Sequence, residues 1–517
     1  MKKKTGAIAA GHPETAKAAG QILQDGGNAF DAVLAAQLMA FVAEPVLTSL
    51  GGGGFLLAEK ASGKQVLYDF FVQTPLQKRN LSQLRFYPII ADFGETKQEF
   101  HIGQGSIATP GMVKGLFDIH RDLCTLPMKR LAEPAIRLAK KGLRINHFQS
   151  GIFDIIKPIY LASPYASQIF RSSGSIDELV QEGEHLKQPE LAGFMEQLVI
   201  DGESLFYDGE IAGSVARNCR ENGGHLTTGD FQNYQVFKRN PLKINYRNHH
   251  IAINPPPASG GILIAFALKL MESMDPEPFQ FGKEPWLDLL VYVQKMTNKA
   301  RVDSFVDHPS DDPVQKLLDP DYLDIYRQEI RNRAASFRGT TQISIADRNG
   351  NMASLTSSNG EGSGVMISGT GVMLNNMLGE KDLNPRGFHS WQTNERVTSM
   401  MAPGIMTMND NTRIVFGSGG SNRIRTAILQ VLLNLADFGM PLKQAVDSPR
   451  IHCEDNQLNV ENGFSNDQLV NLIEYYPNHK IWKEKSLFFG GAHSVSYGSD
   501  GFSGAGDSRR GGVSVVV

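Results

Sequence analysis

The sequence contains little cysteine and almost no excess charge. Its 517 residues include only three cysteines, at positions far apart and without a Cys-x-x-Cys spacing: Cys124, Cys219 and Cys453. Neither a disulfide framework nor a structural zinc site is therefore expected. Basic residues number 51 and acidic residues 54, for a net charge of −3. Binding to nucleic acid or to an anionic membrane needs a basic surface, so we expect neither partner.

The sequence also lacks a recognisable export signal and a long apolar run. Lys2, Lys3 and Lys4 resemble the charged start of a signal peptide, but residues 5–20 contain glycine, proline and charged side chains where an apolar segment would be needed. No stretch of about 20 apolar residues, the length of a membrane-spanning helix, occurs elsewhere. These observations predict a cytoplasmic protein.

Common catalytic and nucleotide-binding motifs are missing or incomplete. The glycine run at residues 51–54 is followed by Phe55 rather than by the Lys-Ser/Thr of a phosphate-binding loop. Residues 103–108 match a loose dinucleotide pattern, but charged residues precede them where an apolar strand would be required. The chain has no HExxH or GxSxG motif and no metal-ligand pattern, so no cofactor is expected.

The composition that remains is that of a folded protein: 41% of the residues are hydrophobic and 20% are charged. The length allows two to four units or one large multilayer fold. Glycine is abundant, with 52 residues in clusters, which indicates tight turns or close backbone contacts.

Hydrophobic spacing predicts helical stretches that alternate with groups of strands along the chain. The expected helices cover residues 13–41, with a break at Gly26 and Gly27 and a new start at Asn28 or Asp31, then much of 131–336, including 262–274, and 423–438. The expected strands cover residues 51–58, 65–71, 242–253, 340–347, 352–356, 404–408, 413–416, 493–497 and 512–517.

Two segments carry candidate chemistry. In Gly417-Ser418-Gly419-Gly420-Ser421, glycines join a strand to a helix, and backbone N–H groups at such a turn can stabilise an anion or an oxyanion. The alternative is an ordinary strand-to-helix turn. Thr340, at the head of a strand, is equally an ordinary β-former. Its hydroxyl could act as a nucleophile only if cleavage after Gly339 freed the Thr340 amine to serve as its base.

Taken in order, short segments spread along the chain resemble those of the γ-glutamyltranspeptidase family of N-terminal-nucleophile hydrolases, which includes γ-glutamyl transferases and hydrolases and the cephalosporin acylases. The matching segments are residues 20–32, 44–45, 51–55, 110–111, 255–261, 340–341, 374–376 and 417–424.

The resemblance implies an α+β fold, a four-layer αββα sandwich forming one large interdigitated domain. The precursor would cut itself before Thr340, and the large subunit (1–339) and the small subunit (340–517) would stay together as a heterodimer. The freed Thr340 would attack an amide carbonyl of a small-molecule or short-peptide substrate, and water or an amine acceptor would release the acyl group. Thr356 and Ser358 match positions that steady the threonine.

The resemblance places the oxyanion hole at Gly419, Gly420 and Ser421, and leaves open which two N–H groups point inward. It also places an arginine for the substrate carboxylate where this chain has Phe71, so a charge-assisted contact is lost. Further differences from the family are Gly360 for Asn, Glu380 for Asp, Met377 for a polar residue and Gln342 for His.

The remaining substrate-binding candidates are polar. Asn359, Glu361 and Glu380 could bind an amine or a polar head, and Thr398 and Ser399 keep hydroxyls where the family binds carboxylate. Residues 376–396 are too few for a lid loop, so we expect an open site.

These observations predict a self-processing amidohydrolase or acyltransferase that forms an acyl-enzyme at Thr340. Its substrates would be γ-glutamyl-like or glutaryl-like amides, with selectivity altered from that of γ-glutamyl enzymes. One alternative is an ordinary glutathione hydrolase or γ-glutamyltransferase. Another is an unprocessed, non-catalytic binding protein of the same fold.

Overall fold

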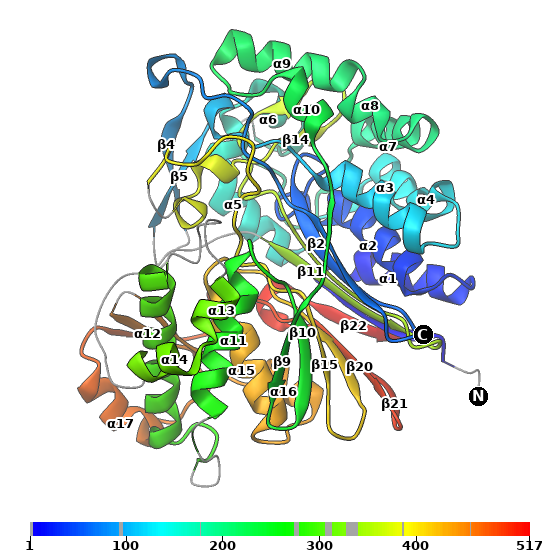
Figure 1. Ribbon diagram of the computed structural model, residues 1–517. Coiled ribbons are helices and arrows are strands. Elements are labelled where there is room, and N and C mark those ends of the chain that lie inside the picture. The colour runs from blue at the N-terminus through cyan, green and yellow to red at the C-terminus, as the bar shows by residue number, and fades with distance from the viewer. Residues whose placement is uncertain are drawn as a thin grey trace.

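Two β-sheets lie face to face at the centre of the molecule, and helices cover the outer side of each sheet (Figure 1). The computed structural model describes residues 4–92, 97–175, 177–272, 274, 279–304, 313–326, 340–384, 387–454 and 456–517. This arrangement of helix, sheet, sheet and helix confirms the predicted four-layer α+β sandwich.

The larger sheet interleaves strands from before and after residue 339. Its order is β22 (Val513–Val516), β1 (Gly6–Ala10), β11 (Thr341–Asp347), β12 (Met352–Ser358), β2 (Gly53–Glu59), β3 (Gln65–Phe70) and β8 (Phe237–Arg239). The second sheet has the order β21 (Gly501–Ala505), β20 (Ser494–Gly498), β16 (Arg413–Phe416), β15 (Gly404–Thr407), β10 (His249–Ile253) and β9 (Leu242–Tyr246).

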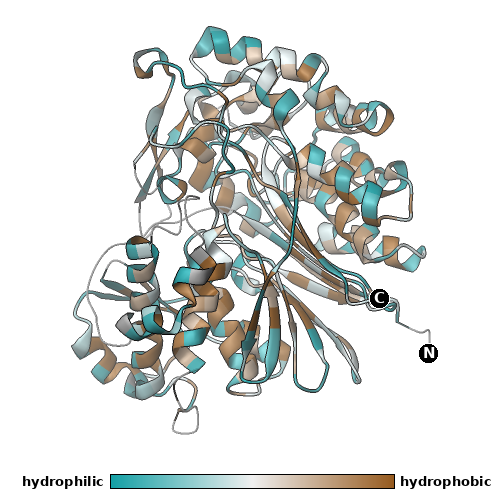
Figure 2. Cartoon of the chain, in the orientation of Figure 1, coloured by the Kyte–Doolittle hydropathy of each residue, from teal (hydrophilic) through white to brown (hydrophobic). Residues whose placement is uncertain are grey.

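Alternating side chains of the larger sheet serve two different cores. In β1, Ala7 and Ala9 belong to the cluster between the sheets, whereas Ile8 and Ala10 face the helices on the outer side. This follows from the two-residue repeat of a strand, and both faces are apolar because both are covered. Figure 2 shows the result: hydrophobic residues follow the strands and the helix faces that lie against them.

Helices fall into two groups, one on each outer face. On the larger sheet's side lie α1 (Pro13–Gln24), α2 (Ala29–Ala43), α3 (Met112–Leu123), α4 (Met128–Lys141), α5 (His147–Leu161), α6 (Pro164–Phe170), α7 (Pro189–Asp201), α8 (Ser204–Tyr207), α9 (Glu210–Asn222) and α10 (Thr228–Asn233). On the second sheet's side lie α11 (Ser259–Glu272), α12 (Glu284–Ser304), α13 (Pro313–Leu317), α14 (Pro320–Tyr326), α15 (Arg423–Ala436), α16 (Leu442–Asp447) and α17 (Asn466–Tyr475).

Short elements complete the chain. They are β4 (Tyr87–Asp92) with β5 (Lys97–Ile102), β6 (Leu143–Arg144) with β7 (His185–Leu186), β13 (Met366–Ile367) with β14 (Val372–Met373), β17 (Ile451–Glu454), β18 (Gln457–Val460) and β19 (His479–Ile481), and the 3₁₀ turns η1 (Leu81–Gln83), η2 (Gln104–Ser106), η3 (Met377–Gly379), η4 (Lys381–Leu383), η5 (Leu487–Phe489) and η6 (Ser508–Arg510). No helix in the described part of the chain is both long and apolar enough to cross a bilayer.

The predicted break between the first two helices is confirmed. Asn28 caps α2, because its side chain accepts hydrogen bonds from two N–H groups of the first turn while Asp31 bonds back to the Asn28 N–H. Every residue of α2 is buried, and the helix packs on β11 and β12. The Asp347 carboxylate, at the end of β11, accepts from the Ala29 N–H and so fixes the start of α2 to the sheet.

Two sequence-based expectations need correction. Residues 242–253 were expected to form one strand, but they form the hairpin β9–β10, because Arg247 and Asn248 both adopt positive φ angles and turn the chain. The stretch 131–336 also contains the short strands β6, β7 and β8 among its helices. Gly339, the residue before the predicted cleavage point, lies outside the described residues.

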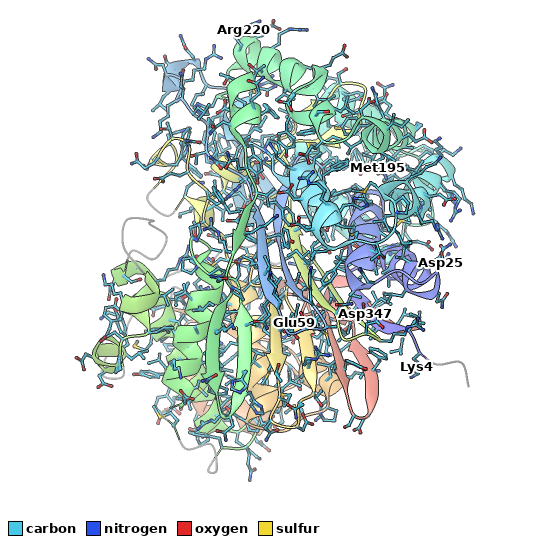
Figure 3. All side chains as sticks on the ribbon, turned by 45° about the vertical axis from the view of Figure 1, so that its right-hand side comes forward. Lys4, Asp25, Glu59, Met195, Arg220 and Asp347 are labelled. Carbon is cyan, nitrogen blue, oxygen red and sulfur yellow. The ribbon has the colours of Figure 1, made fainter. Side chains whose placement is uncertain are left out.

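The direction of the strands places the candidate site. Strands β2 and β11 run the same way, and Glu59 and Asp347, labelled in Figure 3, mark the end they share. The starts of both strands therefore lie at the opposite end of the sheet, where Thr341 follows Thr340.

Candidate active site

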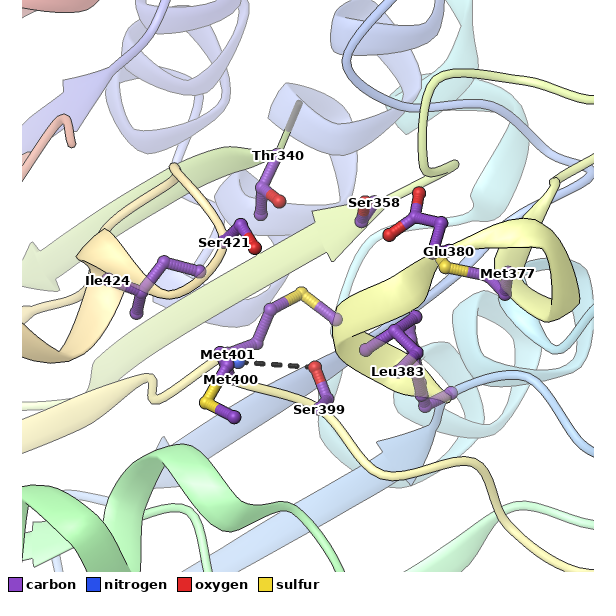
Figure 4. A pocket seen from close by; sticks show the side chains of 11 residues that line it. Thr340, Ser358, Met377, Glu380, Leu383, Ser399, Met400, Met401, Ser421 and Ile424 are labelled. Atoms are coloured by element: carbon purple, nitrogen blue, oxygen red, sulfur yellow. Dashed lines mark hydrogen bonds between the residues drawn. The ribbon is translucent and has the colours of Figure 1, made fainter. Parts of the chain in front are cut away.

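Thr340 lies at the edge of an open pocket of about 320 Å³, one residue before β11. Its side chain points into the pocket beside those of Ser421 and Ser358 (Figure 4). The Thr340 carbonyl accepts a hydrogen bond from Arg510 Nη1 at 3.3 Å. The residue is held at its backbone while its hydroxyl faces the pocket.

The pocket walls are mostly apolar. Among the described residues that line it, six are hydrophobic, four carry hydroxyls and one carries a carboxylate: Phe71, Met377, Leu383, Met400, Met401 and Ile424; Thr340, Ser358, Ser399 and Ser421; and Glu380. The Ser399 hydroxyl accepts from the Met401 N–H at 3.1 Å, the dashed line in Figure 4. Five of the predicted site residues thus meet at one pocket with Thr340: Phe71, Ser358, Glu380, Ser399 and Ser421.

Pairing of β11 with β12 brings Ser358 to Thr340. Gln342 pairs with Thr356 and Thr341 with Ser357, so the next pair outward is Thr340 with Ser358. The Thr356 hydroxyl donates to Gln342 Oε1 at 2.5 Å. Gln342 Nε2 in turn donates to Ser344 and Ser354. Thr356 is therefore not among the described residues that line the pocket. Its side chain is held through Gln342 to β11, the strand that follows Thr340.

The glycine turn after β16 packs directly against the Thr340 strand. A Cβ at Gly417 would collide with the Gln342 side chain, and one at Gly419 would collide with the Thr340 carbonyl oxygen. A residue larger than glycine at position 417 or 419 would have to displace β11 or break the contact between β11 and the turn. The Gly419 N–H is directed to the Gly491 carbonyl at 3.4 Å.

The next two N–H groups of this turn are differently placed. Gly420 has φ of 121° and Ser421 has φ of 53°, a left-handed conformation that is strained for a serine. No acceptor among the described residues takes the N–H of Gly420 or Ser421. The Ser421 hydroxyl donates to Asp382 Oδ2 at 2.6 Å, which holds the turn. The two N–H groups at the start of α15 can therefore serve an anion.

Phe71 closes one wall of the pocket. It is buried and stacks on Phe55, with ring centroids 5.4 Å apart. The nearby Arg396 does not take the place of the missing arginine, because its Nε lies 3.3 Å from Asp69 Oδ1 and its Nη1 donates to the Tyr234 hydroxyl at 2.7 Å. Arg396 also donates to the Phe71 carbonyl, on the backbone side of that residue.

Gly360 and Glu380 fit each other. Gly360 has φ of 64°, and a Cβ there would collide with Glu380 Oε1 and Asn376 Oδ1. The long side chain of Glu380 therefore occupies space that a side chain at position 360 would fill. Gly360 and Glu380, two of the differences from the family resemblance, are therefore structurally coupled: the small residue at 360 makes room for the long one at 380.

The family model described as gamma-glutamyltranspeptidase matches residues 15–517. The chain belongs to the γ-glutamyltranspeptidase family. It is 28% identical to the glutathione hydrolase proenzyme of Bacillus subtilis (strain 168), over 99% of this chain and 92% of that protein. It is also 28% identical to the acylase ACY 1 proenzyme of Pseudomonas sp. (strain V22), over 99% and 93% of the two chains.

The fold has solved counterparts. The crystal structure of a cephalosporin acylase from Bacillus halodurans superposes with a TM-score of 0.84 and 23% identity, covering 99% of this chain and 96% of that one. The chain is therefore an amidohydrolase or acyltransferase of the γ-glutamyltranspeptidase family, with relatives among both glutathione hydrolases and acylases.

Three of the substrate-binding candidates that the family resemblance suggested are buried beside the pocket without lining it. The Thr398 hydroxyl donates to the Pro257 carbonyl at 2.9 Å. The Glu361 N–H donates to Asn376 Oδ1 at 2.9 Å, and Asn359 is buried next to it. These residues shape the loops behind Glu380 and Ser399.

Two charged residues near Thr340 were not predicted from the sequence as site residues. Arg510 is buried, bonds the Thr340 and Leu487 carbonyls, and has its pKa lowered to about 10 by burial. Glu44 accepts from the hydroxyls of Thr341 at 2.6 Å and Thr15 at 2.7 Å. Burial raises the pKa of the Glu44 carboxyl. Glu44 lay in a matching segment, but nothing in the sequence marked Arg510.

Proposed function

We propose that the protein cuts its own chain between Gly339 and Thr340 and then uses Thr340 as the nucleophile of an amidohydrolase. The observation that carries the proposal is that Thr340 lines the same pocket as Ser421. The N–H groups of Ser421 and Gly420 have no acceptor among the described residues, so they are available to a developing oxyanion.

Processing starts with attack of the Thr340 hydroxyl on the Gly339 carbonyl, which turns the peptide bond into an ester. Water then hydrolyses the ester, leaving a carboxylate on Gly339 and a free amine on Thr340. The interleaved strands of the larger sheet keep subunits 1–339 and 340–517 together, since β1, β2 and β3 come from one and β11 and β12 from the other.

In the mature enzyme, the Thr340 amine takes the proton of the Thr340 hydroxyl as it attacks the substrate carbonyl. The N–H groups of Gly420 and Ser421 stabilise the oxyanion. The amine then gives its proton to the leaving amine, and an acyl ester remains on Thr340. Water or a second amine releases the acyl group and restores the hydroxyl.

The acyl group of the substrate is γ-glutamyl-like or glutaryl-like. The selectivity of this enzyme for acyl groups differs from that of γ-glutamyl enzymes. Phe71 supports this, because it presents an aromatic wall and no charge to the pocket. The rival assignment is an ordinary glutathione hydrolase or γ-glutamyltransferase, which the similarity to the Bacillus subtilis enzyme favours. If the enzyme hydrolyses glutathione in clear preference to all other acyl amides, the rival assignment is correct.

Mass spectrometry under denaturing conditions tests the nucleophile. The wild-type chain of 56.7 kDa should yield two fragments, the smaller beginning at Thr340. Thr340→Ala should stay a single inactive chain, because it lacks the hydroxyl for both steps. Thr340→Ser is the matched control and should still be cut, since it keeps a hydroxyl.

Two fragments from Thr340→Ala would assign the cut to another residue. A wild-type chain that stays intact and hydrolyses no amide would instead favour a non-catalytic binding protein.

A further inference from the structure

Thr341, the residue after the proposed nucleophile, is held from the face of the sheet opposite the pocket. Successive side chains of a strand point to opposite faces, so Thr340 faces the pocket whereas Thr341 faces helix α2. The buried Thr341 hydroxyl donates to Glu44 Oε2 at 2.6 Å. Glu44 is the C-terminal cap residue of α2, and its Oε1 accepts from the hydroxyl of Thr15 in α1 at 2.7 Å. The start of β11 is thereby fastened to two helices.

The facing residue on β12 is held in the same way. Ser357 pairs with Thr341, and its hydroxyl donates to Gln37 Oε1 at 3.0 Å and lies 3.0 Å from the Thr48 hydroxyl. Past its first turn, α2 is apolar except for Gln37. Ser357 directly precedes Ser358, which lines the pocket. A layer of buried polar side chains therefore lies immediately behind the pocket, between β11–β12 and the helices.

The carboxyl of Glu44 is closely surrounded. A Cβ at Gly11 would collide with Glu44 Oε2 and would lie 3.1 Å from the Thr341 hydroxyl oxygen. Glu44 is 6% exposed, and no lysine, arginine or histidine among the described residues pairs with its carboxyl, whose partners are the hydroxyls of Thr341 and Thr15. An apolar side chain of this size would be less costly to bury. The stability of the fold therefore does not account for a carboxyl at this position.

Chain cleavage makes the anchor at Thr341 more important. Once the bond before Thr340 is cut, Thr340 is a chain end that is joined covalently to the protein through Thr341 alone. Chain ends are poorly ordered unless contacts tie them down. A displacement of about 1 Å at a reacting group can lower a rate by about 100-fold. Arg510 fixes the Thr340 carbonyl, and Glu44 fixes the next residue from the other face of the sheet.

We propose that Glu44 is a positioning residue for the reactions at Thr340: it holds the Thr341 hydroxyl and so sets where the Thr340 hydroxyl lies, both in chain cleavage and in amide hydrolysis. Glu44 is not among the described residues that line the pocket, so it acts through Thr341. The inference rests on the proposed Thr340 mechanism and adds to it a residue outside the pocket.

Thr341→Val tests the inference, because valine has nearly the shape of threonine but cannot donate to Glu44. Denaturing mass spectrometry at fixed times after the start of expression should show self-cleavage slowed by about tenfold. In the processed protein, kcat for the faster of glutaryl and γ-glutamyl p-nitroanilide should fall by about tenfold, with KM within about twofold of wild type because the pocket wall is unchanged. Thr341→Ser keeps the hydroxyl and should restore both rates to within about threefold of wild type.

Thr15→Val is the matched control. It removes the other hydroxyl that bonds the same carboxyl, at an equally buried position, but in α1 rather than beside Thr340. Both valine variants should lower the melting temperature by similar amounts, because each takes one buried hydroxyl from Glu44. Thr15→Val should nevertheless keep kcat within about twofold of wild type.

The outcomes separate this inference from the mechanism beneath it. Wild-type cleavage and kcat in Thr341→Val overturn the inference and leave Thr340 as the nucleophile. An equal loss of kcat in Thr15→Val also overturns it, because the loss would then follow stability rather than the position of Thr341. A wild-type chain that is neither cut nor active overturns both. If Thr341→Val does not fold, Thr341→Ser and Thr341→Ala decide, since these two differ only in the hydroxyl and equal rates overturn the inference.

Discussion

The two ends of the pocket are built from different parts of the polypeptide: backbone groups at one end and side chains at the other. The proposed catalytic end, around Thr340 and the turn at residues 417–421, is made of backbone groups and glycines in close contact. The acyl-binding end is made of side chains, chiefly Phe71, Met377 and Glu380. In the sequence, residues 340–341 and 417–424 at the proposed catalytic end match the family resemblance, whereas Phe71 and Glu380 at the acyl-binding end differ from it.

The difference has a physical cause. Backbone groups that must approach within van der Waals contact tolerate no added atoms, so the catalytic end can change only by losing its geometry. Side chains that line a wall can change in compensating sets, as Gly360 and Glu380 do. Under the proposed mechanism, separate parts of one pocket carry the reaction type and the substrate choice.

Gly419→Ala should have the largest effect. Its Cβ would collide with the Thr340 carbonyl oxygen, so the variant should lose self-cleavage and about 1,000-fold or more of its activity. Denaturing mass spectrometry and p-nitroanilide hydrolysis measure both. Gly213→Ala in α9 is the control, because its Cβ would meet no described atom within 4 Å. Normal cleavage and activity in Gly419→Ala would show that the catalytic end has more freedom than the packing indicates.

Acidification should weaken the support of the catalytic end. His493 precedes β20 of the second sheet, and its carbonyl accepts from the Ser344 hydroxyl of β11 at 2.8 Å. Its Nδ1 accepts from the Asp507 N–H at 3.1 Å, and burial lowers the pKa of the imidazole from 6.5 to about 4. Between those values the unfolded chain binds a proton that the folded chain does not. The free energy of unfolding should therefore fall as the pH falls from 6.5 to 4, by about 3 kcal/mol from this residue.

Urea unfolding at several pH values measures this effect. Thr340→Ala is a suitable background because it is expected to remain one chain. Adding His493→Gln, which cannot titrate, should reduce the pH dependence by about the same 3 kcal/mol. An unchanged dependence would mean that His493 does not control the acid limit, and that other buried histidines, such as His12 and His225, account for it.

Phe71→Arg should have a smaller effect, confined to the acyl-binding end. A cation in this wall should raise the rate ratio of glutaryl p-nitroanilide to butyryl p-nitroanilide, which lacks the carboxylate, by about tenfold, because it offers the carboxylate a partner. Self-cleavage, checked first by mass spectrometry, should persist. Phe71→Leu is the uncharged control and should leave the ratio near its wild-type value. Loss of cleavage in Phe71→Arg, with a folded chain, would show that the two ends are not separable.

Local patterns in the sequence were enough for much of the fold. The Gly26-Gly27 break, the Asn28 cap and the alternation in residues 340–347 depend on near neighbours, so they can be read without the rest of the chain. The hairpin at residues 247–248 was missed because a two-residue turn of Arg and Asn carries no glycine or proline signal.

The order of motifs by itself identified the family and pointed to Thr340 and the glycine turn. Only the tertiary structure decided which side chains meet. It brought Glu380 and Phe71 to the wall of the Thr340 pocket, left Thr398 behind that wall, and placed Arg510, 170 residues away in sequence, on the Thr340 carbonyl. Such long-range contacts depend on how the two sheets pack, and packing leaves no local pattern in the sequence.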